Sequence, residues 1–196
     1  AVFADVSGSM AHSIGIGCQI AAYLARMAKG KVWLVFYNSM PTMHDVTGKS
    51  LDEIAEMTKR QVAGGGTAPG CALRALQERK LMVDGIALIS DLNDNGAPRF
   101  PDAYRQYSKF VEKDVPIYAY QLRGDPPTLL DSMPAAGIEM HVFNLLGGLD
   151  HYSLPTLAQT MRTNRYGLVQ EINDMPLLRV KDVLRNLAMK VEPIAA

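Results

Sequence analysis

The sequence has few of the features that mark several classes of protein. It contains two cysteines and one tryptophan in 196 residues, and it has no surplus charge, because 20 basic residues balance 20 acidic ones. Cys18 and Cys71 lie far apart in the sequence, which argues against a disulfide framework or a zinc cluster and fits a reducing compartment. Balanced charge gives no general attraction to nucleic acid or to a membrane surface. We therefore expect a cytoplasmic protein.

Long apolar runs are also absent. No stretch approaches the roughly 18 apolar residues that suggest a transmembrane helix, and no signal peptide pattern is present, so we expect no contact with a membrane. The chain begins without methionine and inside an apolar run, which predicts a fragment of a longer protein. With 48% hydrophobic residues, it can still bury the core of one domain.

Apolar runs alternate with segments of helical periodicity along most of the chain. This alternation predicts an α/β fold with a doubly wound, mostly parallel sheet and helices on both faces. The predicted strands span residues 1–4, 31–37, 41–47 (a short edge strand), 85–90, 116–122 and 138–143. The predicted helices span residues 13–29, 51–62, a short segment ending near 79, 102–113 and 155–163.

The last part of the chain predicts an addition to this fold. We assign residues 1–163 to the domain and residues 164–196 to a C-terminal extension. The extension contains an apolar stripe at helical spacing, made by Leu177, Val180, Leu184, Leu187 and Val191. A helix with such a stripe must bury it, so we expect it to pack on the domain or on a second copy of the chain. The sequence predicts no oligomeric state.

Oxygen-bearing side chains gather where predicted strands end. Asp5, Ser7 and Ser9 follow the first strand, Thr67 follows three glycines, and Asp91 follows the strand at 85–90. Because parallel strands end at the same edge of a sheet, we expect these side chains to converge. Carboxylate and hydroxyl oxygens suit Mg²⁺, or alternatively Mn²⁺ or Ca²⁺. The competing interpretation is a simple turn in which Ser9 or Ser13 caps the following helix.

In this order, the five residues resemble the metal-ion-dependent adhesion site of von Willebrand factor A domains, over about residues 1–163. The resemblance implies a Rossmann-like fold in which the hydroxyls of Ser7, Ser9 and Thr67 ligate Mg²⁺. It implies that Asp5 and Asp91 act largely through bound water. A partner protein would complete the coordination with a Glu or Asp carboxylate, so the implied role is binding and not catalysis.

Four further residues are expected on the ligand-binding rim of this site, namely Met10, His12, Gly66 and Asp94. The turn from Asp91 to Asp94 is longer than the Thr-Asp-Asn turn of the resembled domains. Asp94 is therefore expected to compete with Asp91 for the metal.

Three segments resemble the Ro autoantigen (TROVE) group within that superfamily, residues 35–40, 46–51 and 63–67. This resemblance implies an intracellular, RNA-binding ribonucleoprotein in which a helical-repeat domain, absent from these 196 residues, holds small noncoding RNA. Two alternatives stay open. One is a von Willebrand A partner of a MoxR-type AAA+ ATPase. The other is a metal-assisted hydrolase, which would need a general base and has only Asp94 or His12 to offer.

Overall fold

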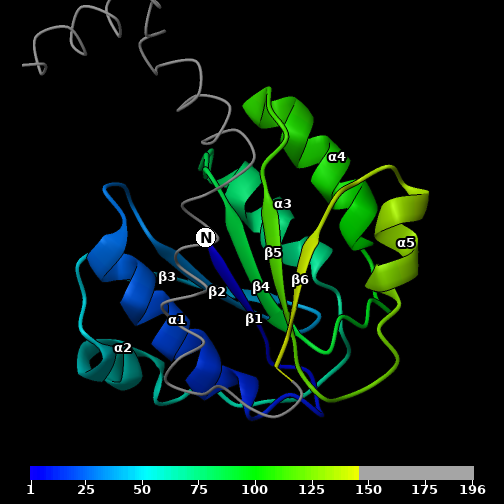
Figure 1. The fold of residues 1–196 in the computed structure, drawn as a ribbon. Coiled ribbons are helices and arrows are strands. Elements are labelled where there is room, and N and C mark those ends of the chain that lie inside the picture. The colour runs from blue at the N-terminus through cyan, green and yellow to red at the C-terminus, as the bar shows by residue number, and fades with distance from the viewer. Residues whose placement is uncertain (146–196) are drawn as a thin grey trace, which may run out of the picture. The chain divides into compact units, whose positions relative to one another are not determined.

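The computed structural model describes residues 1–145, which form a six-stranded sheet between two layers of helices (Figure 1). The strands are β1 (Val2–Asp5), β2 (Trp33–Tyr37), β3 (Pro41–Asp45), β4 (Ile86–Ser90), β5 (Ile117–Gln121) and β6 (His141–Asn144). The helices are α1 (Ser13–Met27), α2 (Leu51–Thr58), α3 (Gly70–Glu78), α4 (Phe100–Val111) and α5 (Leu129–Ala135). The sheet order is β3-β2-β1-β4-β5-β6, with only β3 antiparallel to its neighbour. The predicted α/β class, with a mostly parallel and doubly wound sheet, is confirmed.

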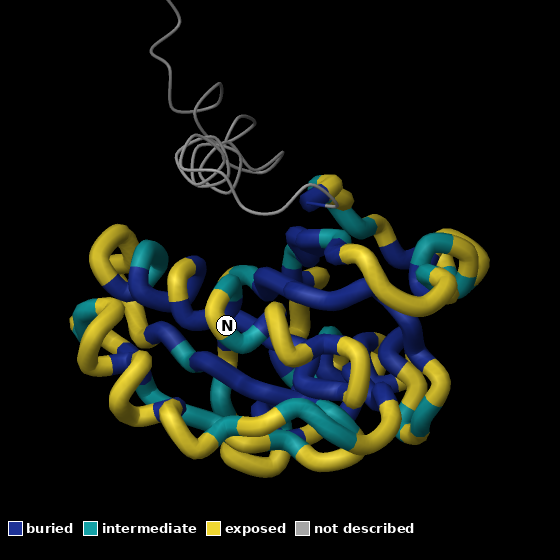
Figure 2. The backbone as a smooth tube through the Cα atoms, turned by 90° about the horizontal axis from the view of Figure 1, so that it is seen from below, coloured by how far each residue is buried: buried dark blue, intermediate teal, exposed yellow. Residues whose placement is uncertain are grey.

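The central strands are buried on both faces, which explains their continuous apolar sequences. Every residue of β1 and of β4 is buried, and Figure 2 shows buried segments, in dark blue, through the interior of the domain. Phe3 belongs to the core under α3, α4 and α5, whereas the neighbouring Ala4 faces Gly17 of α1. Successive residues of a strand point to opposite faces, so one strand serves both helical layers.

Helix α2 begins at the capping box that the sequence predicts. The Ser50 hydroxyl accepts a hydrogen bond from the Glu53 N–H at 3.3 Å, and Glu53 Oε2 accepts one from the Ser50 N–H at 2.8 Å. The exchange satisfies two N–H groups that a helix start leaves free.

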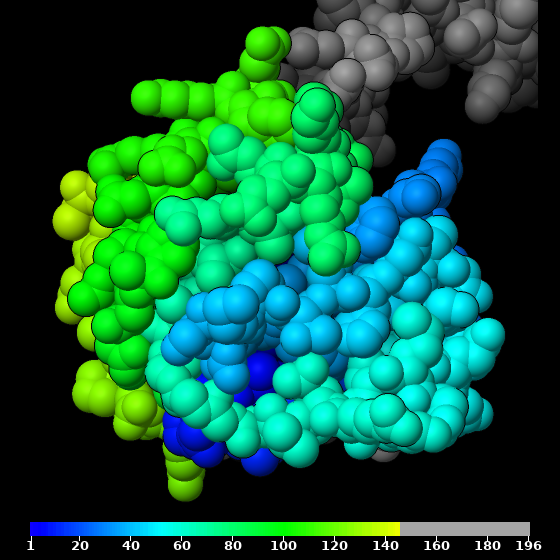
Figure 3. Space-filling view, turned by 180° about the vertical axis from the view of Figure 1, so that it is seen from behind, coloured from blue at the N-terminus to red at the C-terminus, as the bar shows by residue number. Residues whose placement is uncertain are grey.

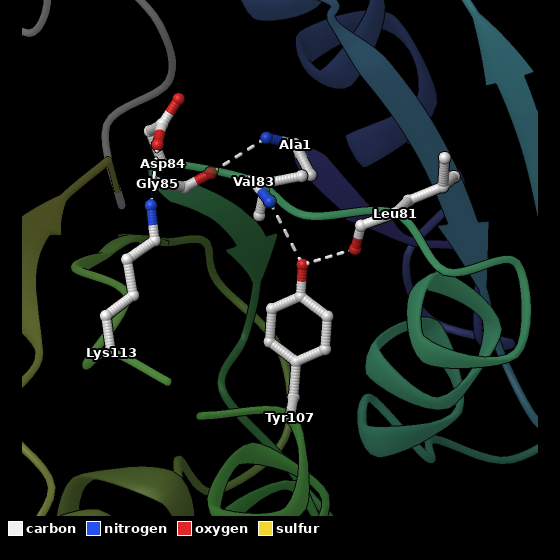
Figure 4. Close-up of polar contacts among 7 residues, drawn as sticks. All are labelled: Ala1, Leu81, Val83, Asp84, Gly85, Tyr107 and Lys113. Carbon is white, nitrogen blue, oxygen red and sulfur yellow. Dashed lines mark hydrogen bonds and ion pairs between the residues drawn. The ribbon is translucent and has the colours of Figure 1, made fainter. Parts of the chain in front are cut away.

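Tyr107 fixes the segment that leads into the N-terminal end of β4 (Figure 4). Asp91 follows the other end of this strand. The Tyr107 hydroxyl donates to the Leu81 carbonyl at 2.7 Å and accepts from the Val83 N–H at 3.1 Å. Beside it, the Ala1 nitrogen donates to the Gly85 carbonyl at 2.8 Å. These bonds set where β4 starts relative to β1.

One helix and several boundaries differ from the sequence prediction, among them β6, which begins at His141 and not at residue 138. Helix α5 was not predicted, since Pro134 lies inside it and a proline argues against a helix; burial of Leu129 and Met133 stabilises it nevertheless. Helix α2 ends at Thr58, whose hydroxyl donates back to the Ile54 carbonyl at 2.9 Å. Helix α4 starts at Phe100, two residues before the predicted start.

The predicted helix at 155–163 and the extension at 164–196 lie outside the described residues. None of the helices within residues 1–145 is long and apolar enough to cross a membrane.

Candidate metal centre

Two aspartates lie at the point where the sheet reverses its winding. Asp5 ends β1 and Asp91 directly follows β4, and these two strands are parallel neighbours. The connection from β1 leads to α1 on one face of the sheet, and the connection from β4 leads to α4 on the other. Ligands of open α/β sheets bind in the crevice that such a reversal creates.

One serine hydroxyl joins the two carboxylates. Ser90 Oγ lies 2.7 Å from Asp5 Oδ2 and 3.3 Å from Asp91 Oδ1, and it accepts a hydrogen bond from the Leu92 N–H at 2.9 Å. The sequence places Ser90 beside Asp91, but nothing in it indicates a contact with Asp5. The pairing of β1 with β4 creates that contact.

Both carboxylates are buried without a cationic partner. Asp5 is 0% exposed and Asp91 is 2% exposed. Asp5 Oδ1 accepts the Ser7 N–H at 2.8 Å. Burial raises the pKa of Asp5, against the hydrogen bonds from Ser7 and Ser90, and the charge of Asp91 raises it further. No lysine or arginine of residues 1–145 forms an ion pair with either group.

Backbone hydrogen bonds hold Asp91 in place. Its Oδ1 accepts the Asn93 N–H at 3.0 Å, and its Oδ2 accepts the Asp125 N–H at 2.8 Å. The two donors belong to different loops, one after β4 and one after β5. Asp91 is therefore fixed by two segments that are more than thirty residues apart.

The glycine loop before α3 (residues 63–67) is hydrogen-bonded to the loop after β1. Gly8 donates to the Gly65 carbonyl at 3.2 Å, and Gly64 donates to the Val6 carbonyl at 2.8 Å. The Asn38 side chain adds a bond to the Gly64 carbonyl at 2.7 Å. Gly65 has φ +80°, a conformation that favours glycine. Dark-blue atoms from the start of the chain accordingly adjoin turquoise ones from this loop in Figure 3.

Thr67 connects this loop with the loop after β4. Its N–H donates to Asn95 Oδ1 at 3.1 Å, and its carbonyl accepts the Gly96 N–H at 2.7 Å. Thr67 is 4% exposed. The structure thus joins the three segments that carry Asp5, Thr67 and Asp91.

The other expected residues fall into two groups. Ser9, His12 and Gly66 are exposed, whereas Met10 is fully buried and packs in the core. Asp94 is 4% exposed, and its Oδ2 accepts the Phe100 N–H at 2.8 Å at the start of α4. Neither Ser9 nor Ser13 caps α1, because the residue before that helix is His12 and the Ser13 hydroxyl donates to the Asp5 carbonyl.

The donor set fits a hard divalent cation. Within residues 1–145, no group of three or more His, Cys, Asp or Glu side chains is placed to hold a metal. The candidate set has two carboxylates, and its remaining donors are the hydroxyls of Ser7, Ser9 and Thr67. Two buried carboxylates that accept hydrogen bonds only from neutral donors among residues 1–145 are groups whose charge a cation would offset.

No protein-family model matches this chain, and no characterised protein matches its sequence. Solved structures do share its fold. The BatB protein of Bacteroides thetaiotaomicron matches with a TM-score of 0.57 and 14% identity, over 81% of this chain and 94% of that one.

Two further structures match as well. An aerotolerance-related membrane protein of Bacteroides fragilis, with multiple mutations to serine, gives a TM-score of 0.56 and 12% identity over 81% of this chain and 95% of that one. A von Willebrand factor type A protein of Catenulispora acidiphila gives 0.54 and 17%, over 82% of this chain and 40% of that one. The chain has a von Willebrand A-type fold. At these identities the likeness concerns the fold alone.

Proposed function

We propose that this von Willebrand A-type domain is a metal-dependent binding module. Asp5, Ser7, Ser9, Thr67 and Asp91 would hold one Mg²⁺, or Mn²⁺ or Ca²⁺ in its place. The observation that carries the proposal is the pair of buried carboxylates, Asp5 and Asp91, which are linked through Ser90 at the switch point and have no cationic partner among residues 1–145.

The residue types favour binding of an acidic protein ligand. Neutral hydroxyl oxygens contact a cation without cancelling its charge, so a bound cation would keep its attraction for one more anionic group. A Glu or Asp side chain of a partner protein supplies such a group. Ser9, His12 and Gly66 are exposed and are the residues that this partner would meet.

Metal binding is tested by calorimetric titration of the protein with MgCl₂ and MnCl₂. We expect one site in the wild-type chain and at least about a tenfold loss of affinity in Asp5→Asn, because the substitution removes one of two buried charges (about 1.4 kcal/mol or more). Asp114→Asn removes an exposed aspartate between α4 and β5 and is the matched control. Equal affinity in Asp5→Asn and wild type would refute the proposal, provided that both have the same circular dichroism spectrum.

The ligand class is tested by selecting displayed random peptides on the Mg²⁺-loaded protein and eluting them with EDTA. We expect the eluted peptides to share an aspartate or glutamate. Peptides without this enrichment, or peptides that EDTA fails to release, would exclude a carboxylate ligand at the metal.

We further propose that the module is not an enzyme. One oxygen of the buried Asp94 carboxylate holds the start of α4 through the Phe100 N–H, and the exposed His12 is the other general base that the sequence offers. The expected result is no hydrolysis of p-nitrophenyl phosphate above the Mg²⁺ background. Turnover that is lost in His12→Ala would establish the hydrolase alternative instead.

The wider setting that we propose is a cytoplasmic, Ro/TROVE-like ribonucleoprotein, on the strength of the three sequence segments given above. Since this chain has no net charge, its own affinity for small RNA should stay in the non-specific range, with Kd about 10⁻⁴ to 10⁻⁶ M at physiological salt. Filter binding at several salt concentrations measures it. Salt-resistant nanomolar binding would place an RNA surface within these 196 residues.

A further inference from the structure

A cavity of about 480 Å³ with a mixed polar and apolar lining lies between the start of α4 and helix α5. Its polar lining comes from the β4–α4 loop, the first turns of α4, and the α5 segment: Asp94, Arg99, Asp102, Arg105, Thr128 and Ser132. A proline and two alanines complete the wall. The volume falls within the range of small-molecule sites.

Two buried polar atoms in this lining have no hydrogen-bond partner among residues 1–145. They are Asp94 Oδ1 and Ser132 Oγ. Buried polar atoms are almost always paired, and those that are not call for an explanation. Asp94 itself is 4% exposed, and its other carboxylate oxygen is already used by Phe100. Both atoms have almost no exposed surface, so a ligand in the cavity meets them through a rotation of the Asp94 and Ser132 side chains that turns one acceptor and one hydroxyl toward it.

The charges of the lining cancel and so restrict the ligand. Arg99 donates to the Asp94 carbonyl. Arg105 Nη2 donates to the Ala136 carbonyl at 2.8 Å, and Nη1 lies 3.7 Å from Asp102. Each guanidinium keeps further N–H donors after these contacts. A simple anion would be attracted by the two arginines but repelled by Asp94. A simple cation would be attracted by Asp94 but repelled by the arginines.

We propose that this cavity binds a small, neutral, polyhydroxylated molecule such as a polyol or a monosaccharide. Ligand hydroxyls donate to Asp94 Oδ1, exchange a hydrogen bond with Ser132 Oγ, and accept from Arg99 and Arg105. Hydroxyl groups are donors and acceptors at once, so they match this mixed lining. The site is separate from the metal centre and goes beyond the binding role proposed for it.

The cavity is connected to the metal centre through two loops. Asn93 and Asp125 donate their N–H groups to the two oxygens of Asp91. The same loops continue to Asp94 and Thr128, which are joined by the Asp94 N–H donating to Thr128 Oγ1 at 2.9 Å. A ligand that draws these loops together also changes the position of the Asp91 carboxylate. Occupancy of the cavity therefore alters Mg²⁺ affinity, and by linkage Mg²⁺ alters ligand affinity by the same factor.

The test is an NMR titration of the whole 196-residue chain with myo-inositol. We expect saturable shifts of the Asp94 and Thr128 amides, and at least a tenfold loss of affinity in Ser132→Ala. Ser108→Ala is the matched control, because the buried Ser108 hydroxyl in α4 also lacks a partner among the described residues but lies outside the cavity lining. Ser108→Ala should bind like wild type.

Four results would overturn the proposal. These are no saturable shift with myo-inositol, equal binding in Ser132→Ala, equal loss in Ser108→Ala, and stronger binding of inorganic phosphate or methylammonium than of the polyol. The connection between the cavity and Asp91 is measured without metal, from the shifts of the Asn93 and Asp125 amides on addition of the polyol. This measurement therefore gives a result even if Mg²⁺ does not bind. Unchanged Asn93 and Asp125 signals at saturation would remove the connection to Asp91.

Discussion

Gly124 shows how closely a single residue can control the candidate metal centre. A Cβ atom at this position would lie 2.6 Å from the Cβ of Asp91 and 2.7 Å from Met10 Cε. Distances this short force the neighbouring atoms to move. One of these neighbours, Asp91, accepts a hydrogen bond from the N–H of Asp125, the residue after Gly124. The glycine therefore permits the β5–α5 loop to close on Asp91.

Gly124→Ala should consequently weaken both the fold and the site. We expect a loss of about 1–3 kcal/mol in the free energy of unfolding, the range for overpacking, and weaker Mg²⁺ binding. Urea denaturation and calorimetry measure the two effects. Gly30→Ala is the control, since its new Cβ would meet no atom within 4 Å. An unchanged midpoint and Mg²⁺ affinity in Gly124→Ala would mean that the loop does not press on Asp91.

Asp94 should give the protein a measurable pH dependence. Burial raises the pKa of its carboxyl above the ordinary 3.8, while the Phe100 N–H and the Arg99 charge act in the opposite direction. The folded state thus holds this proton more tightly than the unfolded state does. The contribution of Asp94 to stability is highest below 3.8 and falls as the pH rises through the folded pKa.

Asp94→Asn isolates this contribution, because asparagine keeps an oxygen that can accept the Phe100 N–H. We expect the free energy of unfolding of wild type minus that of Asp94→Asn to decrease with rising pH and then level off. Urea titrations at several pH values measure it, with Asp114→Asn controlling for the loss of one charge. A difference that grows with pH would show that ionised Asp94 stabilises the fold.

The residues that support the candidate site were largely beyond sequence reasoning. Asp5, Ser7, Thr67 and Asp91 belong to recognisable motifs at strand ends. Ser90, Asn38 and Gly124 act through contacts that only the folded chain creates, and Ser90 meets Asp5 across 85 positions. Met10, which we expected on the ligand-binding rim, instead lies fully buried inside the domain.

At the scale of elements, α1 approaches β1 through one small residue. A Cβ on Gly17 would lie 2.6 Å from the Ala4 Cβ, whereas a Cβ on Gly15, two residues earlier in the same helix, would meet nothing within 4 Å. Ala4 directly precedes Asp5, so the distance between helix and strand also affects where the metal loop begins.

The two glycines give a matched pair of substitutions. Gly15→Ala should stabilise the protein by about 0.5–1 kcal/mol, because alanine has the higher helix propensity. Gly17→Ala should destabilise it by about 1–3 kcal/mol, since the helix must move away from the sheet. Thermal unfolding of both variants measures this. Equal effects of the two substitutions would mean that the helix does not pack on Ala4.

Element types were predictable where local and tertiary preferences agree. The apolar runs of β1, β2 and β4 are buried on both faces, and the Ser50 capping box marks the start of α2. Helix α5 was missed because Pro134 argues against a helix, and its stability comes from packing that the local sequence does not reveal. The early start of α4 has a similar cause, since Asp94 caps it from six residues away.

At the scale of the whole molecule, the apolar stripe from Leu177 to Val191 remains a prediction from the sequence. Burying such side chains stabilises by about 1.5–3 kcal/mol each before ordering costs. Truncation after Thr163 should therefore lower the melting temperature or change the mass in solution, while Mg²⁺ affinity is retained. Calorimetry measures the melting temperature and the Mg²⁺ affinity, and light scattering measures the mass in solution. Unchanged melting, mass and solubility would identify the segment as a linker.

The strand order also bears on how a cell makes this protein. β1 is made before its neighbours but occupies the middle of the sheet, where Val2 pairs with Leu34 on one side and Ala87 on the other. A ribosome must therefore deliver β4 before β1 gains its second neighbour. Until then an apolar strand edge is open, and such edges recruit other chains. Efficient biosynthesis should depend on a chaperone that shields the nascent chain until β4 has emerged.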